Sequence, residues 1–211
     1  GGFSIVKAVG DGGSGDKTVS HGLSAAPTVI LAKNRDTTYN WDTYFSEGVT
    51  AGSGMRLNTN EGPFTGRWGT INSSIFTCKE NYTWAGTNNY IYYCFTNIEG
   101  YIHAGSYIAN NSTDGTFVYT GFKPAFVLIK GTVSGAGWLI EDNKTSPFNP
   151  SPGILQPFNS SGTYTTSSPN ADLLSNGFKV RTDNAVMGSS SYDPYVYLAL
   201  AENPFQYATA R

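Results

Sequence analysis

Charged residues are scarce in this chain of 211 residues, at 13%, and neither sign dominates, because 13 basic side chains stand against 15 acidic ones. The formal net charge of −2 leaves no excess of cations to neutralise a phosphate backbone or an anionic lipid surface. The longest aliphatic stretches, AFVLI and YVYLALA, are far shorter than the roughly 18 residues of a membrane-spanning helix. We therefore expect neither nucleic acid nor a membrane as a partner.

Cysteine and histidine are almost absent, with two of each. Cys78 and Cys94 are too few for a disulfide framework, although their symmetric placement about Gly86 would let a hairpin bring them together. We expect two separate reduced thiols, with a disulfide as the alternative. His21 and His103 have neither a second ligand at metal-binding spacing nor a nucleophile motif beside them, which favours roles in turns or packing.

Signatures of catalysis are missing as well, since there is no G-x-S-x-G, H-E-x-x-H, phosphate loop or C-x-x-C. The glycine-rich GDGGSGDKT at residues 10–18 is expected to form a hairpin tip, with Ca²⁺ bound by Asp11 and Asp16 as the best metal alternative. A glycosidase would need two carboxylates facing each other across a cleft. Those available are Asp42, Glu47, Glu141, Asp142 and Glu202. We expect no enzyme, cofactor or metal, and keep a polysaccharide-degrading enzyme as an alternative.

The residues that are abundant indicate strands. Hydrophobic content is 39% and aromatic content 14%, enough to bury the core of one large or two small domains. Gly, Ser, Thr, Asn and Tyr are common, which favours strands joined by tight turns over helices. The predicted fold class is all-β.

The chain also contains an internal duplication. HGLSAAPTVILAKN near the start resembles GFKPAFVLIKG near the middle, and later SSIFTC resembles SNGFKV and NYIYYCF resembles PYVYLAL. The first matched pairs share an offset of 97 positions, which grows to 102 and then 105 through two small insertions: Pro27/Pro124, Lys33/Lys130, Trp41/Trp138, Phe76/Phe178, Tyr90/Tyr195 and Tyr92/Tyr197. A period near 100 residues indicates duplication of a domain-sized block, because solenoid and propeller units are much shorter.

Each block predicts six or so short strands, which can form two packed antiparallel sheets. VILAK, FVLIK, YIYYCF and YVYLAL carry apolar side chains on both faces, so we expect them to be central strands. The prediction is two tandem pseudo-symmetric β-sandwich repeats, residues 1–102 and 103–211. One larger merged sandwich is the alternative.

The four tryptophans divide into two kinds. Trp41 and Trp138 recur at matching places and are expected to fill equivalent core positions. Trp68 and Trp84 lie on glycine-rich polar segments without counterparts, so they are candidates for stacking on a sugar ring or packing at a subunit interface. Arg67 and Tyr82 would complete that binding surface. The alternative is local packing of the loops.

The whole chain resembles a duplicated β-rich domain of virion structural and tail-fibre proteins of tailed bacteriophages, particularly marine and cyanobacterial phages. The resemblance is carried by GFSIV, HGL…AP…ILAKNRD, YIYYCFTNIEGY, DGTFVYTGFKPAFVLIKG and, most specifically, LLSNGFKVR and YVYLALAENPFQYATAR. Cys78 departs from that pattern, where an aliphatic or polar residue is expected. The resemblance implies a non-enzymatic component of the phage particle and supplies no catalytic residue.

The expected function is accordingly a tail-fibre or appendage module of the virion that takes part in host-surface glycan attachment and in subunit assembly. A capsid decoration or cement protein is the alternative. The expected partners are copies of the chain itself, other virion proteins and a host glycan, and a homo-oligomer such as a trimer fits proteins of this kind. Because GGFSIV begins without Met, we expect a processed form or a part of a longer protein.

Overall fold

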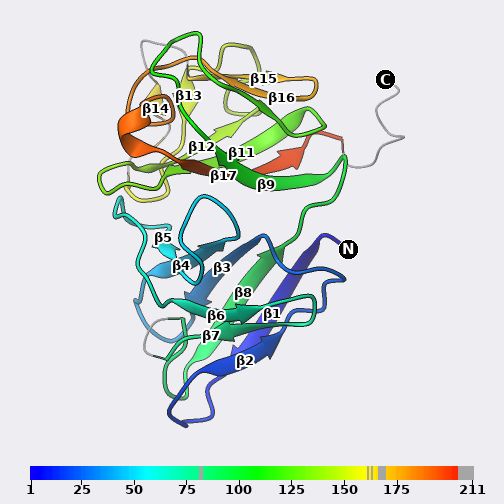
Figure 1. Cartoon of the computed structure of the whole chain (residues 1–211), viewed down its shortest axis with the longest axis vertical. Coiled ribbons are helices and arrows are strands. Elements are labelled where there is room, and N and C mark those ends of the chain that lie inside the picture. Colours follow the sequence, from blue (N-terminus) through cyan, green and yellow to red (C-terminus); the bar gives the residue numbers. More distant parts are fainter. Residues whose placement is uncertain (81–82, 161, 163, 166–169, 204–211) are drawn as a thin grey trace.

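The computed structural model describes residues 1–80, 83–160, 162, 164–165 and 170–203. Its strands form two bodies that follow one another along the long axis of the molecule (Figure 1). The first body holds a five-stranded sheet, β1-β8-β3-β4-β5, and a three-stranded sheet, β2-β7-β6, here the first large sheet and the first small sheet. Their strands are β1 (Phe3–Val9), β2 (Lys17–Ser20), β3 (Val29–Asn34), β4 (Trp41–Phe45), β5 (Met55–Arg56), β6 (Trp68–Ile71), β7 (Ile75–Cys78) and β8 (Asn89–Phe95).

The second body repeats this plan with a four-stranded sheet, β12-β11-β17-β9, and a three-stranded sheet, β10-β16-β15, here the second large sheet and the second small sheet. A ribbon of β13 and β14 and a 3-10 helix, η1, complete it. The elements are β9 (Ile102–Tyr107), β10 (Phe117–Tyr119), β11 (Pro124–Gly131), β12 (Trp138–Asp142), β13 (Gly153–Ile154), β14 (Tyr164–Thr165), β15 (Ala171–Leu174), β16 (Gly177–Val180), η1 (Ser190–Tyr192) and β17 (Tyr195–Ala201).

The duplication extends to strand register. Lys33 pairs with Trp41 in the first large sheet, and Lys130 pairs with Trp138 in the second. The neighbouring strands agree as well, because Tyr92 lies opposite Ala32 just as Tyr197 lies opposite Ile129. All these pairings are antiparallel. The predicted all-β fold of two pseudo-symmetric sandwich repeats is confirmed.

Side chains of the central strands alternate between the two faces of the sheet, and those on the inner face form a separate core in each repeat. Tyr90, Tyr92 and Cys94 of β8 point toward the first small sheet and join the first core, while Tyr195 and Tyr197 of β17 do the same in the second. β8 lies between β1 and β3, and β17 lies between β11 and β9, so the prediction of central strands is confirmed. Successive side chains on a strand alternate between faces, so the remaining residues of β8 and β17 form an outer face on each large sheet.

The two cysteines are free and buried in the first core, as expected, and the alternative of a disulfide is wrong. The Cys78 thiol lies on β7 and contacts the Tyr92 hydroxyl at 3.4 Å, and that hydroxyl donates to the Thr83 carbonyl at 3.0 Å. Burial raises the pKa of Cys78 and of Cys94 to about 12. Both thiols therefore act as small apolar side chains at neutral pH.

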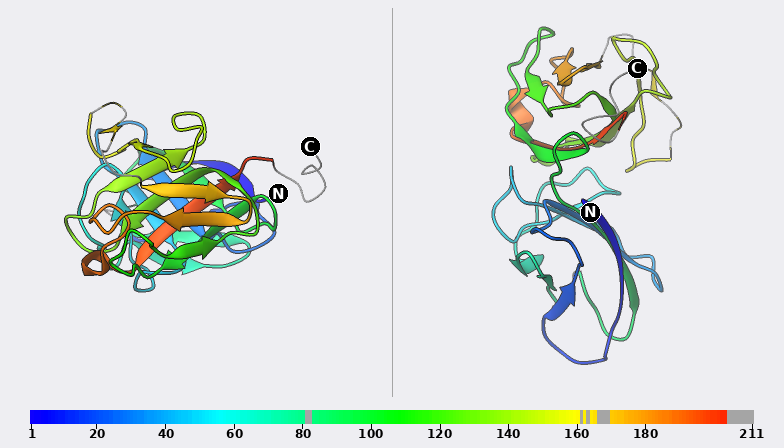
Figure 2. Two further views of the ribbon diagram at one scale, coloured as in Figure 1. Left: turned by 90° about the horizontal axis from the view of Figure 1, so that it is seen from above. Right: turned by 90° about the vertical axis from the view of Figure 1, so that its right-hand side faces the viewer.

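A third core lies between the repeats. Val29, Phe45 and Met55 of the first repeat pack in it with side chains from the outer face of the second large sheet, among them Leu128 and Leu198. Figure 2 shows the two bodies in contact from two further directions. Because each repeat keeps its own large and small sheet, the chain forms two sandwiches in contact rather than one merged sandwich.

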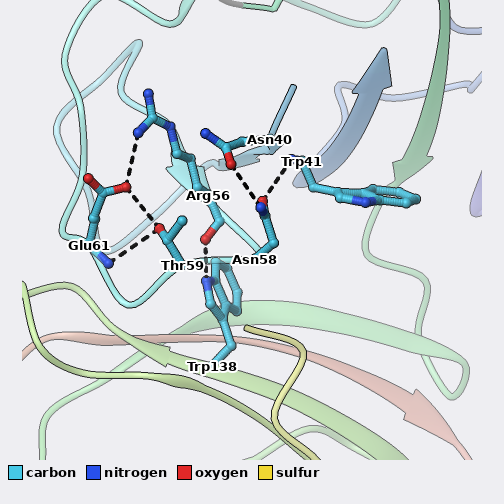
Figure 3. Close-up of polar contacts among 7 residues, drawn as sticks. All are labelled: Asn40, Trp41, Arg56, Asn58, Thr59, Glu61 and Trp138. Atoms are coloured by element: carbon cyan, nitrogen blue, oxygen red, sulfur yellow. Dashed lines mark hydrogen bonds and ion pairs between the residues drawn. The ribbon is translucent and has the colours of Figure 1, made fainter. Parts of the chain in front are cut away.

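Polar contacts also cross between the repeats. The Trp138 indole reaches from β12 into the first repeat and donates to the Arg56 carbonyl at 2.8 Å (Figure 3). The Gly135 amide donates to the Asn60 carbonyl at 2.9 Å. On the first-repeat side, Glu61 accepts from Arg56 and Thr59 and orders the segment after β5. This segment is therefore held against the second large sheet by both apolar and polar contacts.

Candidate functional site

The predicted sugar-stacking surface is wrong, because its side chains are interior. Trp68 begins β6, donates from its indole to the Thr43 carbonyl at 3.0 Å and is only 2% exposed. Trp84 is 1% exposed and packs on Tyr90 with ring centroids 5.8 Å apart. Both indoles therefore pack inside the first core, in agreement with the alternative of local packing.

The remaining two residues of that surface do not restore it. Arg67 is 7% exposed, and its guanidinium lies 4.7 Å from the ring centroid of Phe64. This stacking on an aromatic face keeps the planar cation inside the fold. Tyr82 lies outside the described residues. No solvent-facing aromatic surface is therefore formed by the described members of the predicted site.

Trp41 and Trp138 occupy equivalent positions with different surroundings. Trp138 is fully buried in the third core, as expected. Trp41 is only half-buried, so the prediction of a core position is wrong for it. Figure 3 shows the Trp41 indole pointing away from the contacts that hold Trp138. The difference arises because the outer face of the second large sheet is covered by the first repeat, whereas the corresponding part of the first large sheet is not.

The uncovered outer face of the first large sheet presents several large apolar side chains to solvent. Phe3, Ile5 and Val9 of β1 are 41%, 56% and 53% exposed, although all three are large apolar side chains. Their strand-paired neighbours on the same face are half-buried: Ile91, Tyr93 and Phe95 of β8, Leu31 of β3 and Trp41 of β4. We call this set, with Lys7 and Lys33, the open face. Contiguous apolar patches on a water-soluble surface mark contact sites.

The exposure of Phe3 and Ile5 can be compared with that of the matching residues in the second repeat. Strand register makes Ile102 the counterpart of Phe3 and Ala104 the counterpart of Ile5. These counterparts are 1% and 4% exposed. These two positions of the outer face are therefore buried between the repeats in one sheet and exposed in the other.

Several aromatic rings of the open face pack on one another. Trp41 and Tyr93 lie 6.3 Å apart with an interplanar angle of 23°, and Tyr93 and Phe3 lie 6.5 Å apart with an angle of 11°. Phe3 also packs on Phe95 at 4.8 Å. Rings held by one another lose little side-chain freedom on binding, which favours contact through this surface.

The cations of the open face differ in how they are engaged. Lys33 folds its ammonium group onto the carbonyl oxygens of Asn34, Thr37 and Tyr39, at 2.7, 3.0 and 2.9 Å. Its counterpart Lys130 caps a turn in the same way, and burial lowers the pKa of that lysine to about 8. Lysine recurs in both repeats because one side chain satisfies several turn carbonyls. Lys7 is exposed on β1, the edge strand of the sheet.

The buried carboxyl groups do not form a facing pair. Burial raises the pKa of Asp42 to about 6 and that of Glu141 to about 8. Asp42 lies on β4 of the first repeat and Glu141 on β12 of the second, where it accepts from the Ser151 hydroxyl. Each is enclosed by its own repeat, so the pair lacks the shared cleft that glycoside hydrolysis requires.

The glycine-rich segment at 10–18 connects β1 of the large sheet to β2 of the small sheet, so the prediction of a hairpin tip is wrong. Asp11 pairs with Lys17 and Asp16 pairs with Lys79. Hydrogen bonds from these lysines are the main cause of the lowered pKa of both carboxyl groups. Among the described residues, no group of three or more His, Cys, Asp or Glu side chains is placed to hold a metal ion.

A polar cavity of about 790 Å³ opens on the second repeat. Arg181 donates from Nε to Asp172 at 2.6 Å, and Asn149 is held by the backbone of Leu173. Other lining residues are Thr113, Pro150, Thr182, Asp183 and Asn184. Carboxylate, amide, hydroxyl and guanidinium groups of this kind can bind a polar ligand rich in hydroxyl groups. No helix among the described residues is long and apolar enough to cross a membrane.

Comparison with known proteins places the chain in a family. Residues 1–204 match the model of DUF7483, a domain of unknown function. The chain belongs to the DUF7483 family. No curated protein and no solved structure matches it. The match spans both sandwiches, so the DUF7483 unit is the duplicated fold as a whole rather than one repeat.

Sequence reasoning missed the open face, although part of its signal was present. GFSIVKAV alternates the larger side chains Phe3, Ile5 and Lys7 with smaller ones. That pattern describes an edge strand whose outer face is apolar apart from Lys7, and YIYYCF next to it is apolar on both faces. Neither string states which face lacks a covering layer, because the cover depends on how the repeats stack.

Proposed function

We propose that this DUF7483 chain is a non-enzymatic structural module of a bacteriophage virion, most fitting as a tail-fibre or appendage component that acts through contact. The open face is the observation that supports this function. A rigid double sandwich that presents flat, ordered apolar side chains on one sheet is suited to assembly. The resemblance of the whole sequence to virion structural and tail-fibre proteins supports the same function.

The decisive test is the position of the chain in an intact particle. An antibody raised against the purified chain should label the tail or its fibres in electron micrographs of phage that encode it. Labelling spread evenly over the capsid would instead support a decoration protein. Absence of the chain from purified particles would contradict the proposed function in either form.

Glycan attachment is the second candidate, and the polar cavity around Asp172 and Arg181 favours it. Its side chains offer donors and acceptors that match sugar hydroxyls. Binding to a host polysaccharide should weaken at least tenfold in Asp183→Ala, which removes a lining carboxylate. Ile5→Ser on the open face serves as the matched control and should bind the polysaccharide as the wild type does. Equal binding by all three proteins would exclude the cavity as the glycan site.

A further inference from the structure

The open face continues an interface that is already formed inside the chain. Val29 is fully buried in the third core, and Leu31 and Phe95 pack against that core from the same sheet face. Strand pairing places Tyr93 and Ile5 in the same row as Leu31. The apolar surface therefore passes from buried to exposed without a polar boundary between these rows.

The second repeat shows what covers such a face. Phe45 and Met55, which belong to the first repeat, enclose the Trp138 end of the second large sheet. Gly48 of the same segment lies so close to β17 that an added Cβ would be 2.6 Å from Val196 Cγ1. The covering layer is thus a sandwich of the same topology, which packs its own outer face against the outer face of its relative.

The open face carries two lysines, one of which is engaged by its own turn. The described side chains of the face include no carboxylate, and the Lys33 ammonium is taken up by three carbonyl groups of its own turn. Lys7 lies on the edge strand, where a charge discourages edge-to-edge strand pairing but leaves face-to-face packing possible. An oppositely charged partner is therefore not required for this surface.

We propose that the open face binds the open face of a second copy of this chain, giving a two-fold symmetric dimer. The inference rests on the proposed function as a contact module and names the partner of its surface. Each chain carries one such face, so a face-to-face contact is closed and does not propagate into a filament. In a longer appendage the same contact would join two chains side by side.

The area of the open face is small compared with that of stable protein interfaces. Four strands about 4.8 Å apart, with four outward-facing rows of side chains, give an area on the order of 400 Å² per copy. Stable interfaces bury about 800 Å² per partner, so we expect a weak, reversible dimer. Attachment to a larger assembly would strengthen it through effective concentration.

Sedimentation of the full chain over a range of concentrations tests the proposal. The wild type should shift from monomer to dimer, and Ile5→Glu should remain monomeric at every concentration, because the added charge would be desolvated on binding. Tyr119→Glu is the matched control: Tyr119 is a 64% exposed strand residue of the second small sheet, and this variant should dimerise normally. Unchanged circular dichroism and melting temperature would show that Ile5→Glu remains folded.

Trp41 supplies an independent reporter of the same contact. Trp68, Trp84 and Trp138 are buried within one chain, whereas Trp41 is half-buried on the open face. Tryptophan emission should therefore shift to longer wavelength as the protein is diluted from dimer to monomer. The shift should vanish in Trp41→Phe, while dimerisation measured by sedimentation persists.

The outcomes separate this inference from the proposed function. A wild-type chain that stays monomeric up to about 1 mM overturns the dimer. So does a dimer that Ile5→Glu leaves intact. In either case, labelling of phage tails by the antibody would still support a structural module. A dimer that depends on Ile5, together with absence from phage particles, would support the interface and overturn the virion role.

Discussion

Glu141 illustrates how strongly one buried group can shape stability. It is fully buried on β12, its Oε2 accepts from Ser151, and its Oε1 has no hydrogen-bond partner among the described residues. Burial raises its pKa from 4.5 to about 8, so the folded state holds a proton that the unfolded state releases above pH 4.5. Stability should therefore fall as pH rises from about 4.5 to about 8, by an amount on the order of a few kcal/mol.

Glu141→Gln tests this directly. The amide cannot ionise, so the variant should lose that slope between pH 6 and 8, above the raised pKa of Asp42, and should be at least as stable as the wild type at pH 8. Urea unfolding followed by circular dichroism at several pH values gives the measurement. Glu99→Gln removes a carboxylate from an exposed position and should retain the wild-type slope. A slope that persists in Glu141→Gln would show that another group causes it.

The two equivalent tryptophans should respond differently to truncation. Trp138→Ala removes a fully buried indole and leaves the Arg56 carbonyl without its donor, so a loss of about 3–5 kcal/mol is expected. Trp41→Ala opens no enclosed cavity, because the indole is half-exposed, and should cost about 1 kcal/mol. Thermal and urea unfolding of both variants provide the comparison. Equal losses would mean that the open face is covered in the isolated chain.

At the scale of elements, β7 and β8 enclose both thiols in one core. Cys78 and Cys94 are buried, and burial raises the pKa of each to about 12. Neither thiolate is accessible while the strands remain paired. A thiol-specific dye should therefore react with both cysteines only as fast as the first sandwich opens, and with both at similar rates. Fast reaction of one thiol in native buffer would contradict the described packing of that strand.

The elements also show what the sequence could and could not predict. The repeat, the central position of YIYYCF and YVYLAL and the all-β class follow from patterns within each strand, because alternation and β propensity are local. Trp68 and Trp84 were predicted wrongly because the direction of each indole depends on the sheets that pack around it, which a polar, glycine-rich sequence does not specify. Nothing in the strand pattern of Trp41 and Trp138 distinguishes them, since their different burial depends on which repeat covers the other.

At the scale of the whole molecule, the third core should make the two repeats unfold as one unit. Apolar side chains from both sandwiches share it, and separating them would expose the outer face of the second large sheet, including Trp138 and Leu198. Exposure of that much apolar surface is costly, so a state with only one repeat folded should be sparsely populated. Tryptophan fluorescence, circular dichroism and calorimetry should accordingly report a single coincident transition.

Gly48 provides a probe of this coupling with a matched control in the same chain. Its φ is +74°, and an added Cβ would lie 2.6 Å from Val196 Cγ1 and 3.0 Å from Ser106 Cβ, both in the other repeat. Gly22 has a φ of +70° and open space around it. Gly22→Ala should cost only the backbone strain of about 1–2 kcal/mol, while Gly48→Ala should cost about 1–3 kcal/mol more through overpacking.

The shape of the Gly48→Ala unfolding transition distinguishes coupled repeats from independent ones. If the third core couples the repeats, the whole transition should move to lower temperature and stay single, because the second sandwich loses its cover together with the first. If the repeats were independent, the clash would be relieved by their separation, and Gly48→Ala would melt like Gly22→Ala. Calorimetry of the two variants beside the wild type distinguishes these cases, since equal melting temperatures for both would show that the contact between the repeats contributes little to the stability of either.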